Sequence, residues 1–546
     1  MPEPALDEST KEANFYKHRH RINLPEEVDL DNLAFFPWTK DKILEFRSDA
    51  AKERRPVHTL DEVSKFYSTW SDAIAVASTQ HLFVVFVRQA STRPPIQILF
   101  PAVTESEDED TSQDTDSEDA SQDEYTTRPL DSTRVAWCLD PSNLLEPLVV
   151  CTLGSIVVIF NLRTMKTVGC LRGHGGPITS ISVHPRKPSI FCTTSRDHST
   201  RICELSELKQ QSPENDTFPP QYTKVLGSSA MGFQTNEPES KGLGRCVRIL
   251  VGGRSGGHKA AVMHAAFHPD FPLIATAGLD RTVKIWYIPT PSQVTKGIIR
   301  EDKPLFSSSK IHQSAVLSIH WLTTEMLLSH SAPSLLHEGD ATKPVLGKSN
   351  LAVWRWLAFN QFFPPHQPEA QAVLRGSTAD YLESASFRII ANYALPAVKH
   401  RTILARLSVA RFNGSPYALF TYPELQAIRI IDISTLSPRL IPPFPWPYGK
   451  LPTAEEIKQG LETLRKFDAS PLRAMDGWTL KTADKPSAMT NCAMGLNGAY
   501  VVGIHQSSVC IWTRVEGRKA LGDGVPGRAP AIDDTSMQVD EVISIE

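Results

Sequence analysis

The chain alternates short apolar runs with turn residues, and residues 257–288 show the pattern most clearly. There the run VMHAAF leads to a His-Pro turn, a run of small residues reads LIATAG, and a turn at Asp280 precedes a third run, VKIWYI. Apolar positions that recur every second residue, bounded by Gly, Pro and Asp, are typical of β-strands. The pattern therefore predicts three short strands joined by tight turns.

Residues 173–205 repeat this unit, with an alignment gap of one residue. A unit of about 40 to 45 residues that begins with Gly-His and closes near a Trp is the signature of one blade of a WD-type β-propeller. Two aligned copies make the prediction stronger than one copy would. The aligned pairs are Gly173 and Gly257, His174 and His258, His184 and His268, Asp197 and Asp280, and Cys203 and Trp286.

Weaker copies flank these two units on both sides, each with paired strands that end in an apolar or Trp position. With the two clear units they bring the count to seven. We therefore predict an all-β, seven-bladed WD-repeat propeller that spans residues 56–514. The five weaker copies lie at 71–88, 134–161, 311–356, 404–432 and 490–514.

The length beyond seven blades is expected in loop insertions and in the two ends of the chain. Thr453 and Glu456 have the spacing of a capping box, which predicts a surface helix over 453–467. Residues 1–55 are predicted to be a partly disordered N-terminal arm, and residues 515–546 a disordered C-terminal tail. The predicted insertions are 101–130, which is acidic, 206–245, 332–349 and 433–485.

Charge and composition indicate the partners and the redox compartment that suit this propeller. The net charge is −4, but residues 104–124 hold eleven acids and no Lys or Arg, so the rest of the chain carries +7. A mildly basic body suits a protein that works near nucleic acid or basic tails, although an ordinary solvated surface would have the same balance of charges.

The eight cysteines form no CxxC pair, which favours buried free thiols in a reducing compartment. No run of about 18 apolar residues is present, so no membrane partner is expected.

The most conspicuous polar residues of the clear units are interpreted as blade construction. In a propeller, the histidine before the first strand can bond to the turn Asp, and a Thr and the indole N–H extend that chain of hydrogen bonds. In the first clear unit Cys203 stands where Trp would, so one bond fewer is expected there. The predicted networks are His258, Thr276, Asp280 and Trp286 in one blade, and His174, Thr193 and Asp197 in the other.

No catalytic, metal or cofactor site is predicted. His264 and His268 are four residues apart, but no acid or third ligand lies near them in sequence. No nucleophile motif, paired carboxylates or phosphate loop occurs in a convincing context, so the protein is expected not to be an enzyme.

The blades, read in order, resemble a particular family of propellers. Residues 154–205 are similar to the second and third blades of the embryonic ectoderm development / extra sex combs family, on Met165, Gly173-His174-Gly175, His184-Pro185-Arg186 and Ser195-Arg196-Asp197-His198. Residues 303–331 are similar to the approach to that family's fifth blade. The resemblance is firm over roughly 134–356.

This resemblance implies a nuclear, non-catalytic scaffold of Polycomb repressive complex two, which methylates a lysine of the histone H3 tail and silences genes. One face of the propeller would hold a helix of the Enhancer-of-zeste-type SET methyltransferase subunit, beside other Polycomb subunits. The other face would read trimethyl-lysine of the H3 tail or nucleosome through an aromatic cage, in which rings attract the cation.

At the cage positions this sequence departs from the family. The cage tyrosine before the second-blade Ala-Trp falls at Thr133. The sixth-blade Trp-Tyr pair falls near Ser408 and Val409, or at Arg406 and Leu407 if the alignment gap is moved. The first-blade Phe falls near residues 63–64, where Phe66 and Tyr67 are the nearest aromatic residues. Methyl-lysine reading by the usual cage is therefore expected to be lost or weakened.

One other interpretation stays open. Propellers of this type serve many partners, and the fold alone does not choose between them. An adaptor of another complex, such as a ubiquitin-ligase substrate receptor, is the alternative.

Overall fold

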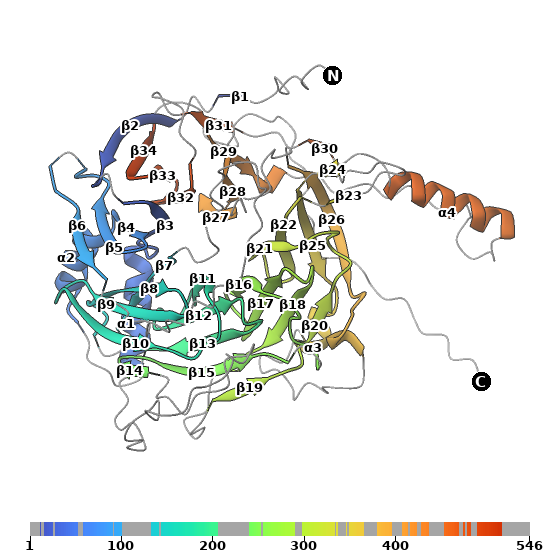
Figure 1. Ribbon diagram of the computed structural model, residues 1–546, viewed down its shortest axis with the longest axis horizontal. Coiled ribbons are helices and arrows are strands. Elements are labelled where there is room, and N and C mark those ends of the chain that lie inside the picture. Colours follow the sequence, from blue (N-terminus) through green and yellow to red (C-terminus); the bar gives the residue numbers. More distant parts are fainter. Residues whose placement is uncertain are drawn as a thin grey trace, which may run out of the picture.

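The computed structural model closes into a ring of sheets around a central axis (Figure 1). Its described residues are 11–12, 16–25, 28–52, 58–90, 92–100, 133–140, 143–205, 240–252, 255–289, 298–333, 335–336, 345–346, 349–364, 379–395, 407–412, 415–422, 427–435, 453–468, 473–474, 478–481 and 489–515.

Seven sheets of four or five strands form the ring, so the predicted seven-bladed propeller is confirmed. In each blade the first-named strand below is the innermost one. Blade one contains β3 (Leu30–Phe35), β4 (Ala73–Ser78), β5 (His81–Phe86) and β6 (Ile96–Leu99). Blade two contains β7 (Val135–Leu139), β8 (Pro147–Leu153), β9 (Ile156–Asn161), β10 (Lys166–Leu171) and β14 (Ser240–Gly242). Blade three contains β11 (Ile178–Val183), β12 (Ile190–Ser195), β13 (Thr200–Glu204), β15 (Arg245–Leu250) and β19 (Ile299–Glu301).

The remaining four blades complete the ring. Blade four contains β16 (Val262–Phe267), β17 (Leu273–Gly278), β18 (Val283–Tyr287) and β20 (Phe306–Ser308). Blade five contains β21 (Val316–Trp321), β22 (Met326–Ser331), β25 (Asn350–Trp356), β26 (Phe387–Ala394) and β30 (Arg473–Ala474). Blade six contains β27 (Leu407–Phe412), β28 (Ser415–Tyr422), β29 (Ala427–Asp432), β31 (Trp478–Lys481) and β1 (Lys11–Glu12). Blade seven contains β32 (Asn491–Gly495), β33 (Tyr500–His505), β34 (Ser508–Arg514) and β2 (Tyr16–Asn23).

The core of the molecule lies between neighbouring blades. A blade packs both of its faces against its neighbours, so the middle strands are buried on both sides; all six residues of β4 and of β17 are buried. Small and β-branched side chains suit this close packing of sheets. The largest fully buried side chains include Trp137, Trp286 and Trp354.

The ring is closed by the N-terminal segment. Strand β2 pairs antiparallel with β34, so residues from the two ends of the chain share blade seven, and β3 then begins blade one. The hydroxyl of Tyr16 donates a 2.5 Å hydrogen bond to the carbonyl of Gly498 in the same blade. The expected boundary at residue 56 therefore falls inside the propeller, because β1, β2 and β3, all from the expected N-terminal arm, belong to its sheets.

A helical hairpin, which the sequence pattern did not predict, interrupts blade one between β3 and β4. It consists of α1 (Lys40–Lys52) and α2 (Leu60–Trp70), and α2 begins with a capping box between Thr59 and Glu62. The hairpin packs Phe46 and Phe66 into the core shared by blades one and two. Like β2 and β3, it places residues of the expected arm against the propeller.

Two of the other insertions contain regular elements among the described residues. Helix α4 (Ala454–Asp468) occupies the predicted place, and its capping box between Thr453 and Glu456 is present. Two-residue strands β23 (Leu335–Leu336) and β24 (Val345–Leu346) pair within the insertion of blade five. Short helices are α3 (Phe359–Phe362), η1 (Ala379–Tyr381) and η2 (Ile433–Thr435). The acidic insertion, most of 206–245 and the tail after residue 515 lie outside the described residues.

Candidate functional site

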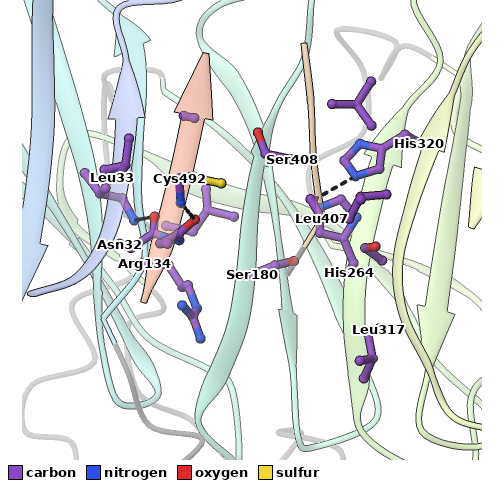
Figure 2. A pocket seen from close by; sticks show the side chains of 16 residues that line it. Asn32, Leu33, Arg134, Ser180, His264, Leu317, His320, Leu407, Ser408 and Cys492 are labelled. Atoms are coloured by element: carbon purple, nitrogen blue, oxygen red, sulfur yellow. Dashed lines mark hydrogen bonds between the residues drawn. The ribbon is translucent and has the colours of Figure 1, made fainter. Parts of the chain in front are cut away.

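The central channel is lined by the innermost strands of all seven blades. It holds a pocket of about 220 Å³ among side chains of these strands (Figure 2). The seven strands occupy equivalent places, so they run in one direction along the channel. We call the end where they begin the N-face and the end where they finish the C-face. The residues that line the pocket include Asn32, Arg134, Ser180, His264, Ser318, His320, Ser408, Val409 and Asn491.

The residues at the predicted cage positions lie toward the N-face. Thr133 directly precedes β7, is 3% exposed and donates its backbone N–H to the carboxylate of Asp31 at 3.2 Å. Ser408 and Val409 lie on β27, are half-buried and line the channel. None of the described residues that line the pocket is Phe, Tyr or Trp. The pocket wall thus offers no such ring to a methylated ammonium group.

Phe66 and Tyr67 lie elsewhere. Both belong to α2, which follows the C-terminal end of β3 and so lies toward the C-face. Phe66 is 7% exposed and its ring centroid is 5.9 Å from that of Phe36; Tyr67 packs on the same core. In blade one the residue beside Thr133 is Asp31. The first-blade cage position expected near residues 63–64 therefore lies in the helical hairpin, whereas the innermost strand of this blade is β3.

At the C-face a second, more apolar groove of about 610 Å³ opens beside the channel. Trp137 of β7 is one of its lining residues, and the indole N–H of Trp137 donates to the carbonyl of Ala34 at 2.8 Å. The end of β3 leads into α1 on one side, and the end of β11 lies on the other. We call this the C-face groove; its lining includes Phe35, Pro37, Trp38, Thr39, Lys42, Ala136, Ile181, Val183, His184 and Pro185.

The predicted hydrogen-bond network of blade four is present. The indole N–H of Trp286 donates to Thr276 Oγ1 at 2.9 Å, and Thr276 Oγ1 lies 2.8 Å from Nε2 of His258. Nδ1 of His258 donates to the carboxylate of Asp280 at 3.1 Å. The chain of bonds fixes the turn between β17 and β18, so these residues stabilise the blade.

Blade three repeats the network with Cys203 in the Trp position. Nδ1 of His174 donates to Asp197 at 2.8 Å, and Nε2 lies 2.8 Å from Thr193 Oγ1. Burial opposes ionisation of Asp197, but His174 and Ser199 hold the pKa of this carboxyl well below its usual range. The pKa of Asp280 is lowered in the same way by His258, Lys259 and Thr282, against the effect of burial.

Blade five carries a third network that sequence comparison missed. Nε2 of His312 lies 2.6 Å from Ser329 Oγ, and the indole N–H of Trp354 donates to the same oxygen at 3.0 Å. Nδ1 of His312 has no hydrogen-bond partner among the described residues, and burial lowers the pKa of His312 to about 3. The sequence pattern did not predict this network, because Ile-His stands in place of Gly-His before the strand and no Asp turn is present.

The spaced histidines of blade four bond to backbone atoms of blade five. Nδ1 of His264 lies 3.0 Å from the carbonyl oxygen of Ile319, and Nε2 of His268 lies 3.1 Å from that of Thr324. Burial lowers the pKa of His268 to about 4. Among the described residues, no three His, Cys, Asp or Glu side chains are grouped so that they could hold a metal ion.

Comparison with known proteins finds WD repeats in two stretches of the chain. The family described as WD domain, G-beta repeat matches residues 165–204 and 244–287. Polycomb group protein FIE1 of Zea mays is 27% identical over 153 residues, which are 28% of this chain and 25% of that protein. Polycomb protein EED of Chaetomium thermophilum is 28% identical over 183 residues, 33% of this chain and 26% of that protein. The aligned segments thus span about a quarter of these relatives.

Solved structures agree on the fold over a longer stretch. A chain in the polycomb repressive complex 2 of Chaetomium thermophilum superposes with a TM-score of 0.54 and 16% identity, covering 91% of this chain and 98% of that one. A chain from a complex with trimethylated histone H3 gives 0.56 and 15%, covering 92% and 98%. No described helix is both long and apolar enough to cross a bilayer. The protein is a seven-bladed WD-repeat propeller related in sequence to the Polycomb proteins of the EED, FIE and esc type.

Proposed function

We propose that this protein is a non-catalytic scaffold subunit of a nuclear, Polycomb repressive complex 2 type histone H3 lysine methyltransferase, and that it supports gene silencing. The relationship to Polycomb EED, FIE and esc proteins carries this proposal. A propeller suits the role, because a rigid ring presents two separate faces to different partners.

The C-face groove is the proposed docking site of the SET methyltransferase subunit. Its lining residues are mainly apolar, and Lys42 is among them. A groove of this kind suits the apolar face of an amphipathic helix. The helical hairpin of blade one builds one wall, so this chain's own insertion would shape the surface for its partner.

We further propose that reading of trimethyl-lysine at the N-face is lost or weakened. A cage attracts the methylated cation through the faces of several rings, and such a contact is worth about 0.5 to 1 kcal/mol at exposed sites and about 2 kcal/mol or more when desolvated. Thr133, Ser408 and Val409 supply no ring, and Phe66 is packed into a core near the C-face.

Affinity purification of the full chain from nuclear extract tests the scaffold role. A SET-type methyltransferase among the captured proteins is expected; cullin adaptors in its place would favour a ubiquitin-ligase receptor and overturn the proposal. Val183→Asp puts a carboxylate into the C-face groove and should abolish capture. Val409→Asp, also at a half-buried inner-strand position but away from that groove, should retain it.

Titration of a trimethylated H3-tail peptide against the purified chain tests the loss of reading. We expect no saturable binding at tens of micromolar. Low-micromolar binding that is blocked by substitutions at Ser408 would contradict this part of the proposal and leave the docking role standing.

A further inference from the structure

Two cysteines face each other across the sheet of blade three, on the neighbouring strands β13 and β15 (Figure 1). Cys203 lies directly opposite Cys246 in this antiparallel ladder, just after an irregularity in register that follows Ile202. The next pair along, Glu204 and Arg245, is also in register, and its side chains form an ion pair of 3.2 Å. That ion pair helps to hold the register that brings the cysteines together.

Backbone geometry and packing both suit a bond between the two sulfur atoms. Directly opposite Cα atoms of an antiparallel ladder are about 4.5 or 5.5 Å apart, and disulfides span Cα distances of about 4.4 to 6.8 Å. Opposite side chains point to the same face of a sheet, and both cysteines belong to the apolar core between blades two and three. The thiol of Cys246 donates a weak hydrogen bond of 3.6 Å to the carbonyl of Arg248, which rotation of this side chain would exchange for the S–S bond.

No other two cysteines lie directly opposite each other in the described sheets, although all eight cysteines lie in described strands. In blade seven, Gly503 stands between Cys492 and Cys510. Two spacings of about 4.8 Å between strands separate these two cysteines, which is beyond the reach of a disulfide. Blade seven therefore provides an internal control for blade three.

We propose that Cys203 and Cys246 form an oxidation site, at which hydrogen peroxide joins the two thiols in a disulfide that fastens blade three. One thiolate attacks a peroxide oxygen, the O–O bond breaks, and a sulfenic acid and one water form. The second thiol attacks the sulfenic sulfur and displaces its hydroxyl group as a second water. The two sulfur atoms thus lose two electrons to the peroxide, and both thiol protons leave in water.

The disulfide would close residues 204–245 into a loop at the base of the insertion in blade three. Such a bond restricts the unfolded chain, and this effect grows with the length of the closed loop. Cys203 is 3% exposed and Cys246 is 7% exposed, so the oxidant reaches them through local opening of the outer strands, and we expect a slow reaction. The site belongs to the isolated chain, so it stands whether or not the proposed complex forms.

Peptide mapping of the full natural chain tests the proposal without any substitution. The reduced protein is treated with hydrogen peroxide, unfolded in an alkylating reagent and digested for mass spectrometry. We expect a cross-linked peptide that contains Cys203 and Cys246, alkylation of Cys492 and Cys510, and reversal by dithiothreitol. Oxidation that leaves Cys203 and Cys246 alkylated, or that joins either one to a different cysteine, would overturn the proposal.

Thermal unfolding measures what the bond does to the blade. Peroxide treatment should raise the Tm of the natural chain by several degrees, and dithiothreitol should reverse the rise. Cys246→Ser should lose this reversible rise, whereas Cys510→Ser, the matched control in blade seven, should retain it. A linked chain with an unchanged Tm, or a reversible rise that persists in Cys246→Ser, would contradict the fastening of blade three.

Discussion

The backbone N–H of Thr133 donates a hydrogen bond to the carboxylate of Asp31, and so joins the beginning of blade two to the beginning of blade one. Where the resemblance expects an aromatic ring, the structure has a buried threonine that is held against an acid. The bond connects the two blades at this point of the N-face.

Thr133→Tyr should therefore fail to restore methyl-lysine reading. The position is 3% exposed, so the larger side chain would overpack the blade junction and lower the free energy of unfolding by about 1 to 3 kcal/mol. Chemical denaturation and titration with a trimethyl-lysine peptide measure the two effects. Tight peptide binding by this single variant would show that space for a cage exists.

Thr276→Val removes the centre of the blade-four network. Trp286 and His258 would each lose their bond to Oγ1, and unsatisfied buried groups cost about 1 to 3 kcal/mol each. Thr193→Val is the matched control in blade three, where Cys203 supplies a weakly donating thiol in place of the indole. Denaturation should show a larger loss for Thr276→Val; equal losses would contradict the role assigned to Trp286.

Stability should fall as the solution is acidified from pH 6.5 toward pH 4. Burial lowers the pKa of several histidines below the unfolded value, so the unfolded chain binds protons first and the folded state loses free energy as pH falls. His320 alone, with a pKa lowered from 6.5 to about 4, would cost about 3 kcal/mol below pH 4. Urea midpoints between pH 8 and pH 4.5 measure the slope. The other histidines in this set are His184, His268, His312 and His330.

Substitution of His320 by Gln tests the source of that slope. The variant lacks one titrating group, so its stability should depend less on pH between 6.5 and 4 than that of the natural chain. An unchanged slope would mean that the acid sensitivity arises in other groups.

The pairing of β2 with β34 closes the ring, so we expect changes in β2 to lower the stability of the propeller. Removal of residues 1–23 would expose the edge of β34, so we expect loss of cooperative unfolding and aggregation. Tyr16→Phe should lower the free energy of unfolding by about 1 kcal/mol, because the hydrogen bond from its hydroxyl to Gly498 is lost. Lys17→Ala, exposed on the same strand, should be neutral. A truncated chain that unfolds like the natural one would refute the closure.

Local pattern was sufficient to predict seven blades, the networks of His174 and His258, and the helix that begins after Thr453. Each of these depends on residues that are close in sequence: strand alternation, a histidine about twenty positions before its Asp, or a capping residue three positions before its partner. The network of His312, Ser329 and Trp354 was not predicted, because a long insertion replaces its Asp turn. The helical hairpin was not predicted, because its residues lie in the expected arm or before the first predicted strands at 71–88.

The tertiary structure alone decided where the ring closes and what its channel holds. The sequence KHRHRIN of β2 is polar, and only its pairing with a strand nearly five hundred residues later makes it part of a blade. The channel pocket likewise draws one or a few side chains from each of seven strands, so no local stretch contains it. The sequence by itself determined the repeat and the absence of rings at Thr133 and Ser408, because these are properties of single positions. Their neighbours, Asp31 and Arg134 among them, follow from how the blades close around the axis.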